Sequence, residues 1–132
     1  MRYCYLSKYS KEIKIGQFVV SAYIENELDP MDGFDDYPAV WTRVNVDIND
    51  QKSEKLYSCL VDLAFADDGF EYDFDRMLEF DGNYFDFTET FGELENDILD
   101  AIHECIFDIE NQSEKEFKEY LEYCINYTEG QN

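Results

Sequence analysis

Residues 40–48 read VWTRVNVDI and carry the clearest strand pattern of the 132-residue sequence. Apolar or β-branched side chains occupy every second position from Val40 to Ile48. The positions between them hold Trp41, Arg43, Asn45 and Asp47. A period of two predicts a β-strand with one face in the core. Trp41 and Arg43 then fall on the polar face, where they would either serve an interface or lie under a helix.

A second strand is predicted on the N-terminal side of this stretch. Ile13 and Ile15 point one way, Gly16 permits a bulge, and the alternation continues on the core face to Ile24. Residues 25–38 combine Pro and Gly with several acids, which is typical of a loop. A loop between two strands predicts that they form an antiparallel pair.

On the C-terminal side, residues 49–51 are predicted to form a turn, and residues 56–65 fit either a strand or a helix. Every second residue of this stretch is apolar from Tyr57 onward, as in a strand. Its leucines also have helical spacing, and Ser53 offers a helix cap. We interpret the stretch as a strand.

Short strands are predicted next in the chain. Residues 67–69 form a turn, residues 70–74 alternate between aromatic and acidic side chains, and residues 77–80 and 83–87 flank Asp81-Gly82, a strong hairpin signal. The aromatic side chains of this region are expected mostly in the core. They are Phe70, Tyr72, Phe74, Phe80, Tyr84, Phe85 and Phe87.

The C-terminal part has helical spacing. Capping boxes that begin at Thr90 and Ser113 predict two helices, at 91–110 and 113–127, joined by a short turn. The predicted fold class is α+β: an antiparallel sheet of about four to five strands with two C-terminal helices packed on one face. We expect residues 1–132 to form a single domain.

The charge is the most unusual property of the composition. Thirty-two Asp and Glu residues against ten Lys and Arg give a formal net charge of −22. Most of the excess lies in residues 62–110, where Arg76 is the only cation. Apolar residues are interleaved there, so the carboxylates are expected at fixed places on a folded surface. Such self-repulsion destabilises a compact state, which favours a function that needs the charge, namely binding to a strongly basic partner.

Two rows of carboxylates are the candidate binding residues. On a helix, a row separated by steps of four, three, four and four residues would place its members about 4.5–6 Å apart along the axis. On a strand, alternate residues would lie about 6.6–6.8 Å apart beside it. The helical row is Glu93, Asp97, Asp100, Glu104 and Asp108, and the strand row is Glu71, Asp73 and Asp75. This spacing is on the scale of nucleic-acid phosphates, which recur every ~3.4 Å of axis along one DNA strand.

In composition and size, the chain resembles the small acidic DNA-mimic proteins of phages and mobile elements, which include anti-restriction and anti-CRISPR inhibitors. The resemblance is one of charge pattern, so it transfers no individual residue. It implies a non-enzymatic decoy that binds the basic nucleic-acid-binding surface of a defence nuclease or effector, such as a CRISPR or restriction complex. An immunity protein that neutralises a basic nuclease toxin is an alternative with the same physics. A further alternative is an acidic calcium-binding or regulatory module.

Other classes of function have weaker support. Acidic loops such as 29–36 and 67–71 offer oxygen ligands, but none has the spacing of the twelve-residue calcium loop. The lone His103 is expected at the surface, and no Ser-His-Asp, phosphate-loop or dinucleotide motif is present. We therefore expect no catalytic residue, metal or cofactor. The charge disfavours direct contact with nucleic acid or anionic membranes.

Location and assembly have only indirect signals. The first 16 residues hold no apolar run of the length that a secretory signal needs, so the cytoplasm is the expected compartment. Cys4, Cys59, Cys105 and Cys124 are widely spaced and are expected to be reduced, as small buried hydrophobes. The sequence leaves the choice between monomer and dimer open.

Overall fold

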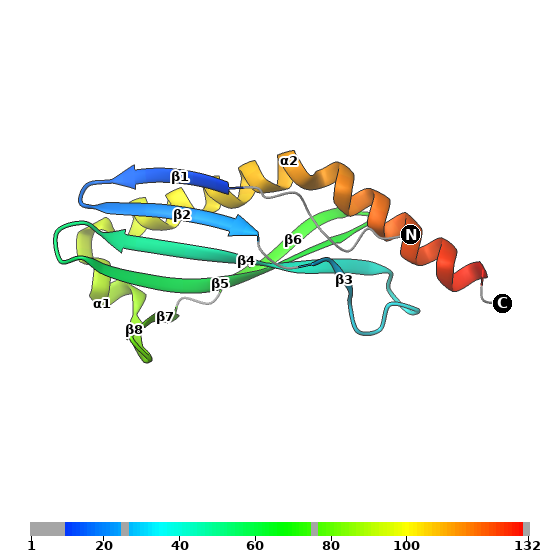
Figure 1. The fold of residues 1–132 in the computed structure, drawn as a ribbon, viewed down its shortest axis with the longest axis horizontal. Coiled ribbons are helices and arrows are strands. Elements are labelled where there is room, and N and C mark those ends of the chain that lie inside the picture. Colours follow the sequence, from blue (N-terminus) through cyan, green and yellow to red (C-terminus); the bar gives the residue numbers. More distant parts are fainter. Residues whose placement is uncertain (1–9, 25–26, 75–76, 131–132) are drawn as a thin grey trace.

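A long β-hairpin lies at the centre of the fold (Figure 1). In the computed structural model, which describes residues 10–24, 27–74 and 77–130, its strands are β4 (Ala39–Asp50) and β5 (Lys55–Ala66). The two strands pair antiparallel along their full length. The strand predicted at 40–48 and the strand interpretation of 56–65 are therefore both confirmed.

Shorter strands flank this hairpin at both ends. Near its turn, β2 (Phe18–Ile24) pairs with β4, and β1 (Ser10–Ile15) pairs with β2. On the other side of the hairpin, β7 (Met77–Phe80) pairs with β5, and β8 (Asn83–Asp86) pairs with β7. At the open end, β3 (Asp29–Pro30) pairs with β4 and β6 (Gly69–Phe74) with β5. The described residues thus form one eight-stranded antiparallel sheet. The predicted antiparallel pairing of β2 with β4 is confirmed, but the predicted number of strands, four to five, is wrong.

The turns explain part of this difference. The bulge predicted at Gly16 is absent. Gly16 instead has a φ of +60° in the turn that joins β1 to β2, so the one strand predicted there is a hairpin of two. The hairpin predicted at Asp81-Gly82 is confirmed, and both residues have positive φ, as a tight hairpin turn requires. The turn predicted at 67–69 is confirmed at residues 67 and 68, and Gly69 already begins β6. The turn predicted at 49–51 begins later, at Gln51, because β4 extends to Asp50.

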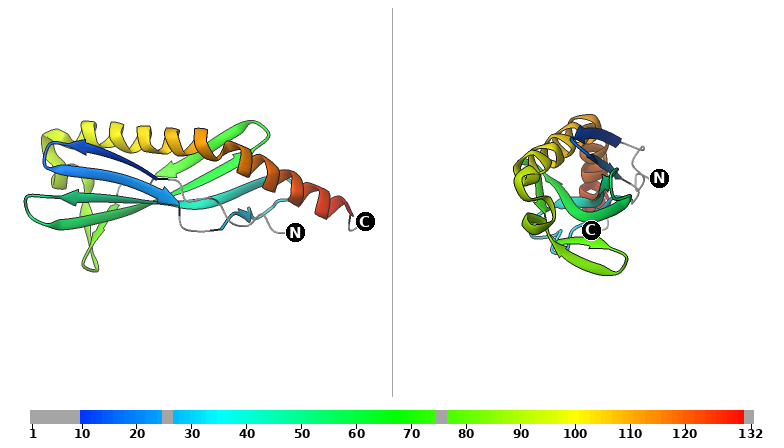
Figure 2. Two further views of the ribbon diagram at one scale, coloured as in Figure 1. Left: turned by 45° about the horizontal axis from the view of Figure 1, so that its top comes forward. Right: turned by 90° about the vertical axis from the view of Figure 1, so that its left-hand side faces the viewer.

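The C-terminal region is one long helix rather than two. A short helix α1 (Phe87–Phe91) and a 3₁₀ turn η1 (Gly92–Leu94) lead into α2 (Glu95–Gly130), which runs along one face of the sheet (Figure 2). The prediction of two C-terminal helices is wrong. Ser113 does not cap a second helix: its side chain is fully buried, and its Oγ donates a hydrogen bond to the carbonyl oxygen of Ile109 at 2.6 Å. No Gly or Pro interrupts the chain there, so the helix continues.

The predicted cap at Thr90 is also wrong. The N-cap of α1 is Asp86, whose carboxylate accepts a hydrogen bond from the Glu89 backbone N–H at 3.0 Å. The Thr90 hydroxyl instead donates to the carbonyl oxygen of Asp86 at 2.7 Å. Gly92, with a φ of +55°, ends α1. The main helix therefore begins at Glu95, four residues later than the predicted start at Phe91.

The core fills the space between the inner face of the sheet and α2. Phe65 of β5 and Phe70 of β6 pack on Phe117 of α2, with ring centroids 6.1 and 5.0 Å from it. Of the aromatic side chains predicted for the core, Tyr84 is an exception at 66% exposed. The others are buried or pack half-buried against the core; they are Phe70, Tyr72, Phe74, Phe80, Phe85 and Phe87.

The three cysteines that the structure describes are buried in this core, as predicted. Cys59 lies on β5, and Cys105 and Cys124 lie on the inner side of α2. Burial raises the pKa of the Cys105 thiol to about 11 and also raises that of Cys124. Burial therefore favours the neutral thiol at both positions. Cys4 lies outside the described residues.

Asp50 holds the turn of the central hairpin. Its Oδ1 accepts hydrogen bonds from the backbone N–H groups of Lys52 and Ser53, at 3.0 and 3.3 Å, and from the Gln17 side-chain amide at 2.9 Å. Burial raises the pKa of this carboxyl, but the hydrogen bonds from Ser53, Gln17 and Lys52 outweigh burial, so the pKa lies below its ordinary value of 3.8. The charged form is thus favoured in the folded state.

We expect Asp50→Ala to lower the free energy of unfolding by about 1–3 kcal/mol at neutral pH, because several donors lose their acceptor. The part of this difference that depends on the charge is fully present above about pH 3.8 and is lost as the pH falls through the lowered pKa of the folded state. Urea denaturation of both proteins, from neutral pH to below about pH 3.8, measures the difference in the free energy of unfolding. A difference that stays constant with pH would contradict the assigned role of the charge.

Candidate partner-binding surface

The first half of α2 presents a row of carboxylates to solvent. Ile98, Ile102 and Ile106 lie on the side of the helix that faces the sheet and are fully buried. The opposite side carries the helix row, which we define as Asp97, Asp100, Glu104 and Asp108. The first three are exposed and Asp108 is half-buried. At a rise of 1.5 Å per residue, successive members lie about 4.5–6 Å apart along the axis.

Glu93 is not part of this row. It is exposed, but it belongs to η1, before α2 begins. The step of four residues from Glu93 to Asp97 therefore crosses a change of helix type. The sequence predicted one continuous row from Glu93, and the structure brings only the other four together on one helix face.

The charge of α2 changes along its length. From Glu95 to Glu114 the sequence holds no Lys or Arg. Lys115 and Lys118 then enter, and Lys118 Nζ lies 2.8 Å from a Glu114 carboxylate oxygen. The formal charges of the helix are therefore all negative in its first half and of both signs in its second half.

An exposed aromatic ring lies beside the helix row. Phe107 is 56% exposed and stands three residues after Glu104. Residues three apart are neighbours on a helix surface. A half-exposed Phe adds nothing to a purely solvated acidic surface, whereas aromatic side chains are enriched at protein interfaces.

The strand carboxylates lie on the other side of the sheet. Tyr72, between Glu71 and Asp73 on β6, points toward the helix layer, where its hydroxyl forms a hydrogen bond with His103 Nδ1. Because side chains alternate along a strand, Glu71 and Asp73 point to the outer face, away from α2. The prediction that they lie beside the helix row is wrong. Asp75 lies outside the described residues.

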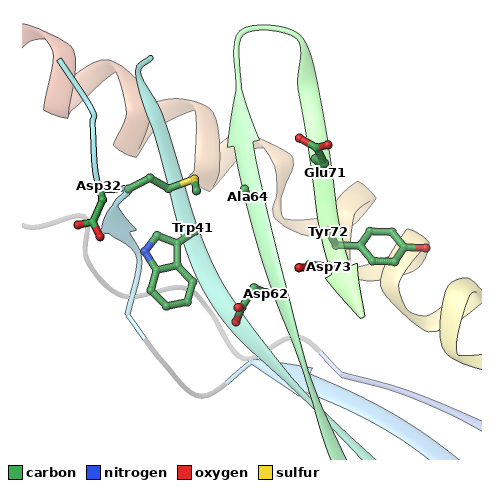
Figure 3. Close-up of a pocket in the computed structure, with 8 residues that line it drawn as sticks. Asp32, Trp41, Asp62, Ala64, Glu71, Tyr72 and Asp73 are labelled. Carbon is green, nitrogen blue, oxygen red and sulfur yellow. The ribbon is translucent and has the colours of Figure 1, made fainter. Parts of the chain in front are cut away.

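On this outer face, Glu71 and Asp73 border an open pocket (Figure 3). Its volume is about 660 Å³, and it lies over β4, β5, β6 and the start of the β3–β4 loop. The residues that line it are Met31, Asp32, Trp41, Asp62, Ala64, Glu71, Tyr72 and Asp73. In Figure 3, Tyr72 extends away from Trp41 and Asp62, as expected for a residue of the opposite face. Trp41 thus lies on the sheet face opposite α2 and not under that helix.

The sequence reasoning did not assign Met31, Asp32, Asp62 or Ala64 to a site. Asp62 and Ala64 could have been found, because the strand pattern from Tyr57 to Phe65 already places both on the outer face. Met31 and Asp32 lie in the β3–β4 loop, whose position no periodicity indicates.

His103 is exposed on α2, as predicted. Its partner Tyr72 has a raised pKa, because of burial and the nearby charge of Glu110. Burial also raises the pKa of Glu110. Within residues 10–24, 27–74 and 77–130, no group of three or more His, Cys, Asp or Glu side chains is arranged to hold a metal ion.

Comparison with protein-family models, with curated proteins and with solved structures gave no match for this chain. Among the described helices, none is long and apolar enough to cross a membrane.

Proposed function

We propose that this chain is a non-enzymatic decoy that occupies the nucleic-acid-binding surface of a basic protein in the cytoplasm. The partner class is a defence nuclease or effector, such as a restriction or CRISPR complex, and the setting is a phage or mobile element. The helix row carries the proposal, because it presents an uninterrupted line of carboxylates on a rigid helix. Basic side chains that bind phosphates also attract such a line, and the encounter is steered by charge.

Three features support the helix row as the contact surface. It lies in the part of α2 that lacks Lys and Arg, so no neighbouring cation of the same helix neutralises it. Buried Ile98, Ile102 and Ile106 hold the helix against the sheet, so little conformational entropy is lost when a partner binds. Phe107 offers an aromatic anchor beside the helix row.

Capture of the partner from lysate of the source cells at low salt is the first test. A decoy should recover one basic nucleic-acid-binding protein. Its affinity should fall on the order of tenfold or more between ~50 and ~200 mM salt, because charge pairs dominate the contact. An affinity that does not change with salt would contradict the proposal, as would recovery of only a diffuse set of basic proteins. Recovery of a toxin nuclease would instead assign the immunity role.

A further inference from the structure

The outer face of the sheet has two rows of facing residues that the strand register places side by side. In the first row, Arg43, Asp62 and Asp73 stand directly opposite one another on β4, β5 and β6. In the second row, two residues along each strand, Trp41 and Glu71 stand on either side of Ala64; the facing pairs are Trp41–Ala64 and Ala64–Glu71. The small Ala64 between two larger residues leaves the open pocket of about 660 Å³.

The pocket combines an aromatic wall with an excess of negative charge. Its charged lining residues are Asp32, Asp62, Glu71 and Asp73, and no described residue of the lining is basic. Arg43 pairs with Asp62, with Nε 3.0 Å from Oδ1, but it lines the neighbouring hollows instead of this one. Asp73 therefore faces a like charge across the strand pair, an arrangement that destabilises a sheet. A second cation in the pocket would relieve this repulsion.

Arg43 itself indicates which kind of cation this surface suits. Its guanidinium lies 5.6 Å from the centroid of the Trp41 ring while its Nε contacts Asp62. A planar guanidinium can stack on an indole and bond a carboxylate at the same time, which a lysine ammonium cannot do as well. Trp41 borders both the hollow with Arg43 and the open pocket. The open pocket offers the same indole together with Glu71 and Asp73 as acceptors.

We propose that this outer pocket is a docking site for an arginine side chain of a partner protein, with its guanidinium between Trp41 and the carboxylates of Glu71 and Asp73. Arginine is the proposed occupant because its positive charge complements the carboxylates and its planar guanidinium can stack on the aromatic wall. The volume lies within the range of ordinary ligand pockets, about 300–1,000 Å³. This site lies on the sheet face opposite to α2, so it does not depend on the helix row or on the proposed decoy function.

Trp41 is the only tryptophan of the chain, so its fluorescence reports on this pocket directly. The full-length protein is titrated with a synthetic Gly-Arg-Gly-Arg-Gly peptide. The neutral citrulline peptide and the lysine peptide of equal charge are titrated in parallel. We expect a saturable change with the arginine peptide, no change with citrulline, and weaker binding with lysine. The absence of a saturable change with arginine, or equal affinity for lysine, would overturn the proposal.

Three variants separate the pocket from general charge. Ala64→Leu fills the pocket without changing the charge, and Glu71→Gln with Asp73→Asn removes two acceptors; each is expected to weaken peptide binding about tenfold. The matched control, Glu119→Gln with Glu122→Gln, removes the same charge from exposed positions of α2 outside the helix row and is expected to bind within about twofold of the natural chain.

The controls also decide between a pocket and a charged surface. Equal weakening by the pocket pair and the α2 pair, with no effect of Ala64→Leu, would show attraction to overall charge and would overturn the site. Urea denaturation confirms that each variant folds, and the exposed positions Glu71 and Asp73 keep the test valid if Ala64→Leu does not fold. Because the titration uses no captured partner, its failure and the failure of the decoy function are distinguishable.

Discussion

Neutralising the helix row should weaken partner binding by about tenfold to a hundredfold and make the free protein more stable. The variant replaces Asp97, Asp100 and Asp108 with Asn and Glu104 with Gln. Each exposed charge pair with a basic partner contributes roughly 0.2–1 kcal/mol, so four lost pairs amount to roughly 0.8–4 kcal/mol, and the middle of this range lies between one and two powers of ten in affinity. The free protein loses like-charge pairs at a spacing of four residues, from Asp100 to Glu104 and from Glu104 to Asp108. Such pairs destabilise a helix by about 0.2–0.5 kcal/mol each.

The opposite signs make this prediction specific. A carboxylate row that served only stability would lower the free energy of unfolding when it was removed, which is the opposite of the change expected here. The matched control removes four exposed carboxylates elsewhere, at Asp35, Asp36, Asp67 and Glu79, and should retain most of the affinity. Titration calorimetry with the captured partner gives the affinities, and urea denaturation gives the stabilities. Equal loss of affinity in both variants would assign the binding to net charge and not to the helix row.

The second large effect is expected at Ser113. Ser113→Pro should lower the free energy of unfolding by about 3 kcal/mol or more, because Pro lacks the N–H and its ring clashes with the carbonyl four residues earlier. That carbonyl belongs to Ile109, and the site is fully buried. Ser113→Ala is the control and should change the stability by less than about 1 kcal/mol, because Ala is the best helix former.

This substitution distinguishes one continuous helix from two. At the start of a second helix, Pro is well tolerated, since the first N–H groups of a helix have no partner within it. Urea denaturation followed by circular dichroism measures the effect. A Ser113→Pro protein of nearly natural stability would contradict a continuous α2 and would favour a helix start at this position.

Ser113 also shows why the sequence reasoning predicted two helices. A Ser followed three residues later by Glu has the pattern of a capping box, and the same Ser stands on the buried side of α2 between Ile109 and Phe117. The steps of four residues on either side keep the apolar stripe in phase. The local sequence around Ser113 is therefore compatible with a helix start and with a continuous helix. Packing against the sheet favours the continuous helix.

The strands were more predictable than their arrangement. Alternation from Val40 to Ile48 and from Tyr57 to Phe65 identifies the central hairpin, because both strands have one buried face. From the sequence alone, Gly16 fits a bulge and a turn equally well, because both can require a residue with positive φ. The count of strands depends on that choice.

In the candidate surfaces, too, local periodicity was predictable and tertiary arrangement was not. The helix row from Asp97 to Asp108 follows from helical periodicity alone, and the structure keeps it on one face. The position of Glu71 and Asp73 relative to that row depends on which face of β6 meets the helix, which is a tertiary property. The outer pocket needs the register of three strands, so no local pattern indicates it.

Competition with nucleic acid tests the decoy function most directly. The captured partner is loaded with its own fluorescently labelled nucleic acid, and this chain is added while the anisotropy of the label is followed. A decoy should lower the anisotropy to the value of free nucleic acid, and no complex should contain both this chain and the nucleic acid. A stable ternary complex, with the label still bound at saturating protein, would contradict the decoy function.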